Sequence, residues 1–175
     1  MAPSLAGRAL AGLALLAASA AACGKPGTLP LTGTIRVAVT PPMRDTGFLP
    51  VLLAAFREES GIEVHPTVGT VAECLRLGER GDADVVVVDD RAAADGFVRA
   101  GKGVLSSEPF LRRGEGSPAR VPHVAVLVRP VAAEHQKTEP ARRFYDWLSG
   151  PRCADLVRSF TAGGTRAFFL PGEDP

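Results

Sequence analysis

The chain has 175 residues, with 20 Lys and Arg against 19 Asp and Glu, which gives a formal net charge of +1. Acids and bases are mixed along the chain, so the composition excludes a basic face for nucleic acid and an acidic tail. If the N-terminal residues are a targeting segment that is removed, about 150 residues remain, which is the usual size of one domain.

The first residues have the layout of a secretory signal. Arg8 precedes an apolar stretch at 9–18, which is followed by small residues and then by Cys23. An apolar run of this length is short for a bilayer, and lipoprotein processing needs small residues directly before a cysteine. We therefore expect residues 1–22 to be a signal peptide and Cys23 to carry lipid. The protein would then be exported and anchored at a membrane surface, facing the periplasm or the cell exterior. The alternative is ordinary signal cleavage beside an incidental cysteine.

Residues 23–33 have the Gly and Pro content of a tether, and one domain is expected at 34–175. Strands are predicted where β-branched residues gather, at 34–40, 62–68, 85–88 and 124–128. Helices are predicted from apolar spacing at 48–56, 71–79, 91–100, 140–148 and 153–160. The four valines at 85–88 are typical of a strand that helices cover on both faces. This alternation predicts an α/β domain with a doubly wound, mainly parallel sheet.

Three smaller features complete the predicted fold. Asp45 or Thr46 is expected to cap the first helix, and Gly61 to end it. The segment 106–122 is crowded with Ser, Gly, Pro and Arg and has no period of either kind, so it is predicted to be a loop. The segment 167–170 is predicted to be a terminal edge strand.

The loops that follow the first three strands are the candidate ligand site. In an open α/β sheet, ligands bind outside the carboxyl ends of the strands, where helix N-termini offer N–H groups to anions. The candidate ligand contacts are Thr40, Arg44 and Thr46 after the first strand, Gly69 and Thr70 after the second, and Asp89 and Asp90 after the third.

Two of these loops also carry features that oppose anion binding. Pro41 and Pro42 follow Thr40 and have no N–H to donate. Within a few ångströms of a dianion, Asp89 and Asp90 would each oppose binding by roughly 1 kcal/mol or more. The alternative interpretation of this acidic pair is a solvated helix start that caps the following helix.

Nothing in the sequence predicts catalysis, a cofactor or a resident metal. The three histidines, His65, His123 and His135, lie far apart in the sequence, and no nucleophile elbow or phosphate loop is present. Cys74 and Cys153 could pair in an oxidising compartment. The alternative for Cys74, which lies in a helical pattern, is a small buried hydrophobic residue.

Several blocks of the sequence resemble, in order and spacing, the tungstate-binding proteins that serve ABC importers. The blocks are DTGFLPVLLAAF at 45–56, GIEV at 61–64, VGT at 68–70, RLGERGDADVVVV at 76–88, FVRAGKG at 97–103, HVAVLVRP at 123–130, FYDWLSGP at 144–151 and GTRAFFLP at 164–171. The resemblance implies a class II periplasmic-binding-protein-like fold, tungstate or molybdate as the solute, and an ABC permease as partner. That family has a second lobe between the blocks at 97–103 and 123–130, where this chain has only the segment 106–122.

A missing lobe removes half of the contacts around a bound oxyanion and prevents the closure that excludes water. We therefore expect a single-lobed, membrane-anchored relative of these receptors with weakened or lost solute binding. Two alternatives remain open, a ligand-free module that binds a protein partner and a degenerate copy without a ligand.

Overall fold

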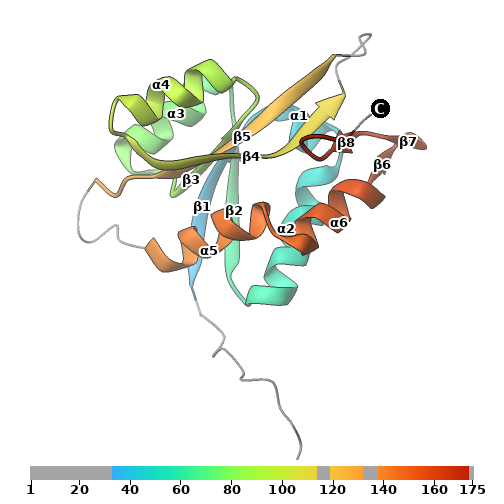
Figure 1. Cartoon of the computed structure of the whole chain (residues 1–175). Coiled ribbons are helices and arrows are strands. Elements are labelled where there is room, and N and C mark those ends of the chain that lie inside the picture. Colours follow the sequence, from blue (N-terminus) through green and yellow to red (C-terminus); the bar gives the residue numbers. More distant parts are fainter. Residues whose placement is uncertain (1–32, 114–118, 132–137, 174–175) are drawn as a thin grey trace, which may run out of the picture.

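The computed structural model describes residues 33–113, 119–131 and 138–173 (Figure 1). Its main sheet has six strands in the order β2-β1-β3-β5-β4-β8. Their bounds are β1 Thr34–Val39, β2 Glu63–Val68, β3 Val85–Val88, β4 Gly103–Arg113, β5 Arg120–Val128 and β8 Phe168–Phe169. The strand β1 is parallel to β2 and β3, whereas β5 is antiparallel to β3 and β4, and β8 is antiparallel to β4. The four predicted strands are therefore neighbours in one sheet, as expected.

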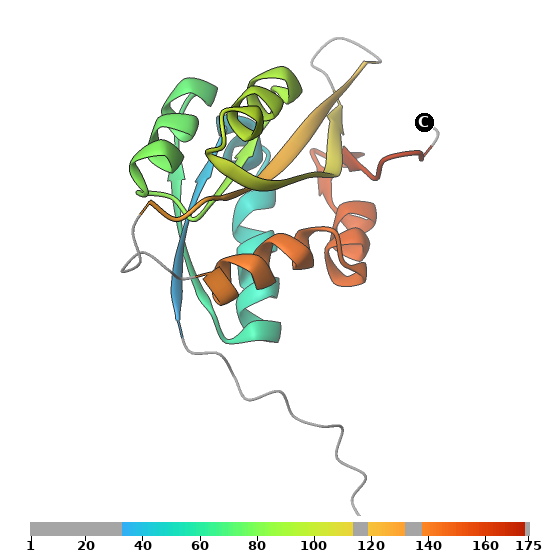
Figure 2. The same ribbon diagram turned by 60° about the vertical axis from the view of Figure 1, so that its left-hand side comes forward.

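Helices cover both faces of this sheet, which confirms the predicted α/β class. The helices are α1 Pro41–Asp45, α2 Phe48–Ser60, α3 Val71–Arg80, α4 Arg91–Arg99, α5 Thr138–Leu148 and α6 Pro151–Ser159. Figures 1 and 2 show α3 and α4 on one face and α2, α5 and α6 on the other. A separate two-stranded hairpin, β6 Thr161–Ala162 and β7 Thr165–Arg166, precedes β8. Among the described residues, no helix is long and apolar enough to cross a bilayer.

The sheet separates two hydrophobic cores, one under each helical layer. Alternate residues of the central strands face one core or the other. In β3, Val85 and Val87 face the larger core, which also receives side chains from α2, α5 and α6. Val86 and Val88 face the smaller core, with side chains from α3 and α4. A strand buried on both faces needs no polar alternation, which explains the uninterrupted valines.

The prediction of a loop at 106–122 is wrong for the part that the structure describes. Most of this segment belongs to β4 and β5, which form a long antiparallel hairpin. Its register shifts between Gly103 and Leu105 and again between Ser107 and Phe110. Such bulges break the period of two by which a strand is detected in a sequence. Phe110, where the pairing resumes after the second shift, is fully buried, and its ring lies 5.5 Å from that of Phe48. Packing therefore stabilises the irregular strand.

The start of α2 also differs from the prediction, whereas its end agrees. The N-cap is Gly47, with φ 78°, because Asp45 and Thr46 belong to the preceding short helix α1 and its end. Gly61 ends α2 with φ 72°, and its N–H donates to the carbonyl of Arg57 at 2.9 Å. The expected signal peptide, Cys23, most of the tether and His135 lie outside the described residues.

Candidate functional site

The three candidate loops meet at the carboxyl edge of the parallel strands. Val39 is in register with Val68 of β2 and Val87 of β3, so the residues that follow these three strands begin at the same level. Two backbone hydrogen bonds join the loops. The N–H of Gly69 donates to the carbonyl of Val39 at 3.1 Å, and the N–H of Thr40 donates to the carbonyl of Val87 at 3.2 Å.

Thr40 is buried at this edge, and the helix that follows it offers no free N–H in its first turn. Thr40 is the N-cap of α1 and is 1% exposed, and its hydroxyl has no hydrogen-bond partner among the described residues. Pro41 and Pro42 occupy the first two helical positions, and the N–H of Met43 donates to the Thr40 carbonyl at 3.4 Å. Because proline lacks an N–H, α1 has no anion-binding N-terminus.

Arg44 and Thr46 are engaged within their own loop. The guanidinium of Arg44 pairs with the neighbouring carboxylate of Asp45 at 2.7 Å, and both side chains are 57% exposed. The hydroxyl of Thr46 donates to the carbonyl of Pro42 at 2.8 Å. The Thr46 hydroxyl is therefore engaged, and the charge of Arg44 is paired with that of Asp45.

Thr70 is the N-cap of α3, and a residue that the sequence analysis did not single out occupies its donors. The N–H and the hydroxyl of Thr70 both donate to Oε2 of Glu73, each at 2.8 Å. The N–H of Glu73 in turn donates to the Thr70 hydroxyl at 3.3 Å, which completes a capping box. These bonds from Thr70 lower the pKa of the Glu73 carboxyl below its ordinary value. The pattern Thr-x-x-Glu at 70–73 was a signal that could have identified this arrangement.

The same carboxylate lies over Gly69. A Cβ atom at Gly69 would lie 3.2 Å from both Cβ and Oε2 of Glu73. Beside them, a surface hollow of about 300 Å³ between β2 and α3 includes Gly69, Glu73, Arg76 and Arg80 in its lining. Gly69, the Glu73 carboxylate and two cations of α3 therefore border one depression.

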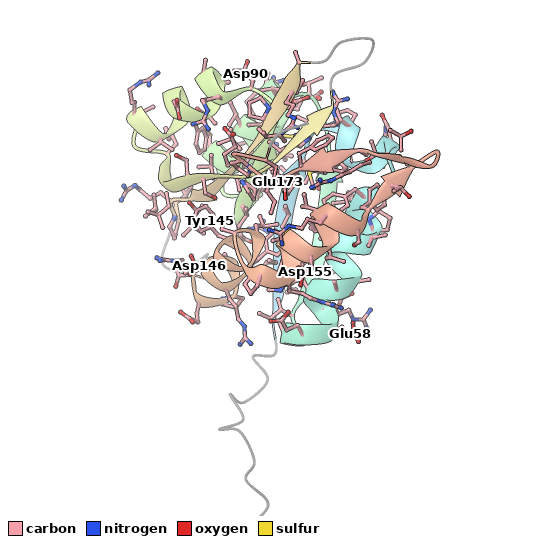
Figure 3. All side chains as sticks on the ribbon, turned by 45° about the vertical axis from the view of Figure 1, so that its right-hand side comes forward. Glu58, Asp90, Tyr145, Asp146, Asp155 and Glu173 are labelled. Carbon is pink, nitrogen blue, oxygen red and sulfur yellow. The ribbon has the colours of Figure 1, made fainter. Side chains whose placement is uncertain are left out.

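The two aspartates after β3 have separate roles. Asp90 is the N-cap of α4, and its Oδ1 accepts a hydrogen bond from the N–H of Ala93 at 2.9 Å, which is the capping alternative expected for this pair. Figure 3 labels Asp90 at the end of the domain opposite to Glu58 of α2. Asp89 is half-buried and lies next to Val88, which is in register with Val124 of β5.

His123 is a second buried polar residue at this edge that the sequence analysis did not place in the site. It is fully buried in β5, with its ring 5.4 Å from that of Phe110 and 5.8 Å from that of Phe168. Neither ring nitrogen has a hydrogen-bond partner among the described residues. Burial lowers the pKa of His123 to about 4, against the opposing charge of Asp89. The imidazole is therefore neutral at pH 7. His123 lies on the same face of β5 as Ala125 and Leu127, both of which belong to the larger core. This alternation was the signal for its burial.

These contacts define what the edge can do chemically. Its acidic groups include Asp45, Glu73, Asp89 and Asp90, and the hydroxyls of Thr46 and Thr70 already donate within the chain. Within the described residues, no group of three His, Cys, Asp or Glu side chains could hold a metal ion. Among the candidate contacts, the side-chain donors of Thr46 and Thr70 are therefore engaged within the chain.

Comparison with known proteins finds sequence similarity to one tungstate-binding protein and fold similarity to several solved structures. No protein-family model matches the chain. Over 72 residues the chain is 38% identical to the tungstate-binding protein TupA of Peptoclostridium acidaminophilum. This matched segment makes up 41% of this chain and 25% of that protein. The matched segment is thus about a quarter of the relative's length.

Solved structures with the same fold include three oxyanion-transport proteins. The tungstate-binding protein TupA from Desulfovibrio alaskensis has a TM-score of 0.70 at 15% identity, over 81% of this chain and 100% of that one. The tungstate ABC transporter structure from Geobacter sulfurreducens has a TM-score of 0.63 at 16% identity, over 73% and 98%. The periplasmic molybdate-binding protein of Azotobacter vinelandii has a TM-score of 0.59 at 11% identity, over 78% and 99%. These proteins are named for binding and transport. The resemblance to the tungstate-binding proteins is thus confirmed, and the chain has the fold of the periplasmic binding proteins.

Proposed function

We propose that this protein is a single-lobed, extracytoplasmic relative of the tungstate receptors of ABC importers, in which oxyanion binding is weakened. The observation that carries the proposal is the state of the donors at the carboxyl edge. Thr70 donates to Glu73, the first turn of α1 begins with two prolines, and the hydroxyl of Thr46 donates to its own loop.

The expected loss of affinity is large. Each charge-assisted hydrogen bond to a bound anion contributes on the order of 1.5–3 kcal/mol. Three lost contacts would therefore weaken binding by several kcal/mol, or roughly a thousandfold or more. Asp89 and Asp90 add negative charge at the same edge. A domain that contacts the anion from one side only also leaves much of the anion's hydration shell in place.

Calorimetric titration of the purified protein with sodium tungstate tests this proposal. We expect a dissociation constant well above 1 µM, because a loss of several kcal/mol of binding free energy raises the dissociation constant of a tight receptor by roughly a thousandfold or more. Residual binding should weaken when Thr40 or Thr70 is changed to Ala, and it should improve in the Asp89→Asn, Asp90→Asn double variant. A sub-micromolar dissociation constant for the monomer would show that one lobe suffices and that the weakening argument is wrong.

A second candidate function is a ligand-free module that binds a protein partner, such as a permease or a two-lobed paralogue. The satisfied capping box at Thr70 and the two prolines of α1 favour it, since both remove donors without any ligand. Absence of tungstate and molybdate binding at millimolar concentration, together with co-purification of a permease subunit, would support this function over the first.

We further propose that Cys23 is lipidated and holds the protein at a membrane. The small residues at 19–22 before Cys23 motivate this proposal. Expression of the precursor with Cys23→Ala should abolish lipid modification and move the protein to the soluble fraction. Unchanged membrane attachment of this variant would contradict lipidation at Cys23.

A further inference from the structure

The Glu73 carboxylate lies where an external oxyanion would bind the loop after β2. Its Oε2 accepts two hydrogen bonds from Thr70, each at 2.8 Å, one from the N–H and one from the hydroxyl. The same oxygen lies 3.2 Å from the position of a Cβ on Gly69. An oxyanion bound to Gly69 and Thr70 would need these donors and this space. The carboxylate is thus an anion supplied by the chain itself.

We propose that Glu73 is the specificity-determining residue of this edge, because its carboxylate competes with an external oxyanion for Thr70 and for the space over Gly69. This inference rests on the proposed function, namely that the edge descends from an oxyanion site, and it names the residue that closes it. An internal carboxylate has a high effective concentration at its own helix N-terminus. It also repels a dianion at short range.

Two further observations indicate that the position would accept an anion once the carboxylate is removed. The hollow bordered by Gly69 and Glu73 is also lined by Arg76 and Arg80, and Arg76 contributes to the lowered pKa of Glu73 by its charge. Thr40 is 1% exposed, and its buried hydroxyl has no partner among the described residues. It follows Val39, whose carbonyl accepts the Gly69 N–H, so it lies on the neighbouring strand end.

Removal of the Glu73 carboxylate has different effects if Glu73 is only a helix cap and if it competes with an external anion. If Glu73 only stabilises α3, its removal lowers the stability of the helix and leaves tungstate affinity unchanged or weaker. If Glu73 competes for the site, its removal raises tungstate affinity despite the lost cap. The binding constant therefore separates the two roles.

The experiment is calorimetric titration with sodium tungstate of the parent protein and of the Glu73→Ala and Glu73→Gln variants. Glu79→Ala is the matched control, since Glu79 is an exposed glutamate near the other end of α3 and its removal changes the net charge equally. We expect Glu73→Ala to bind at least tenfold more tightly than the parent, which corresponds to about 1.4 kcal/mol. Glu73→Gln should show a smaller gain, because its amide oxygen can still accept from Thr70 without the negative charge. Glu79→Ala should bind like the parent.

A second readout locates the bound anion. In Glu73→Ala, tungstate should shift the backbone amide resonance of Thr70 in a ¹H–¹⁵N spectrum, and it should leave the amides of α5, on the opposite face of the sheet, unchanged. Should Glu73→Ala fail to fold, as judged by circular dichroism, the gain of Glu73→Gln over the parent decides the question.

The outcomes separate this inference from the proposed function. Equal, weak binding by the parent and by both Glu73 variants would overturn the role of Glu73 and leave weakened oxyanion binding intact. An equal gain in Glu79→Ala would overturn it as well, by showing a general charge effect. Sub-micromolar binding by the parent would refute the weakening, whereas the ratio of variant to parent would still decide the role of Glu73. No binding by any variant would overturn both.

Discussion

Replacement of His123 by Leu should change the response of this protein to acid. His123 is fully buried against Phe110 and Phe168, and neither of its ring nitrogens has a hydrogen-bond partner among the described residues. Leu has a similar volume and no polar atoms. At pH 7, where the imidazole is neutral, His123→Leu should leave stability unchanged or raise it, because a buried polar group without a partner lowers stability by about 1–3 kcal/mol.

The magnitude of the acid effect follows from the lowered pKa. Burial lowers the pKa of His123 from 6.5 to about 4 in the folded protein. Below pH 6.5 the unfolded chain therefore takes up a proton at this residue while the folded protein does not. Folded-state stability is then lost as the pH falls from 6.5 towards 4. One pKa unit corresponds to about 1.4 kcal/mol, so the loss over this interval is about 3 kcal/mol.

Urea unfolding at pH 7, 5.5 and 4 measures this loss as the difference between the parent and His123→Leu. That difference removes the contribution of the carboxyl groups, which titrate in both proteins. His65→Gln is the control, since His65 is an exposed histidine of β2, and it should follow the parent at every pH. If the parent and His123→Leu lost stability in parallel between pH 7 and 4, the argument from a buried neutral imidazole would be refuted.

Two further predictions concern other parts of the fold. Asp90→Ala should destabilise the domain by roughly 0.5–2 kcal/mol in urea unfolding, because it removes the carboxylate that caps α4, whereas Asp90→Asn should retain most of the cap. Cys74 and Cys153 are free and buried, and burial raises the pKa of their thiols to about 11 and about 12. Both thiols should therefore resist iodoacetamide at pH 8 in the folded protein and react after unfolding. Rapid alkylation of the native protein at either residue would contradict this burial.

The sequence predicts those elements best whose burial leaves a local pattern. The valines of β3 and the β-branched residues of β1 lie in a sheet covered on both faces, and their predicted bounds agree closely with the observed ones. Gly61 was identified as the end of α2 because a left-handed C-cap favours glycine. These features depend on neighbours in the sequence or on burial alone.

The hairpin of β4 and β5 could not be predicted in the same way. Its two register shifts interrupt the alternation of side chains, and the strand is stabilised by partners far away in the sequence, such as Phe48 against Phe110. For the candidate site, the loops that meet at the carboxyl edge could be predicted from strand order. The pattern Thr-x-x-Glu at 70–73 signals the use of the Thr70 donors by Glu73. The bond from the Thr46 hydroxyl to the Pro42 carbonyl could not be predicted, because it depends on side-chain geometry.

The course of β1 sets how the domain would be oriented on a membrane. The chain enters the sheet at Gly33, whose carbonyl accepts the N–H of Glu63, and β1 then runs from this amino edge to Thr40 (Figures 1 and 2). Cys23 lies ten residues before Gly33, a distance of at most about 35 Å for an extended chain. With lipid on Cys23, the bilayer would therefore lie nearest the amino edge. The carboxyl edge with Glu73 would then face away from the bilayer, towards dissolved solutes.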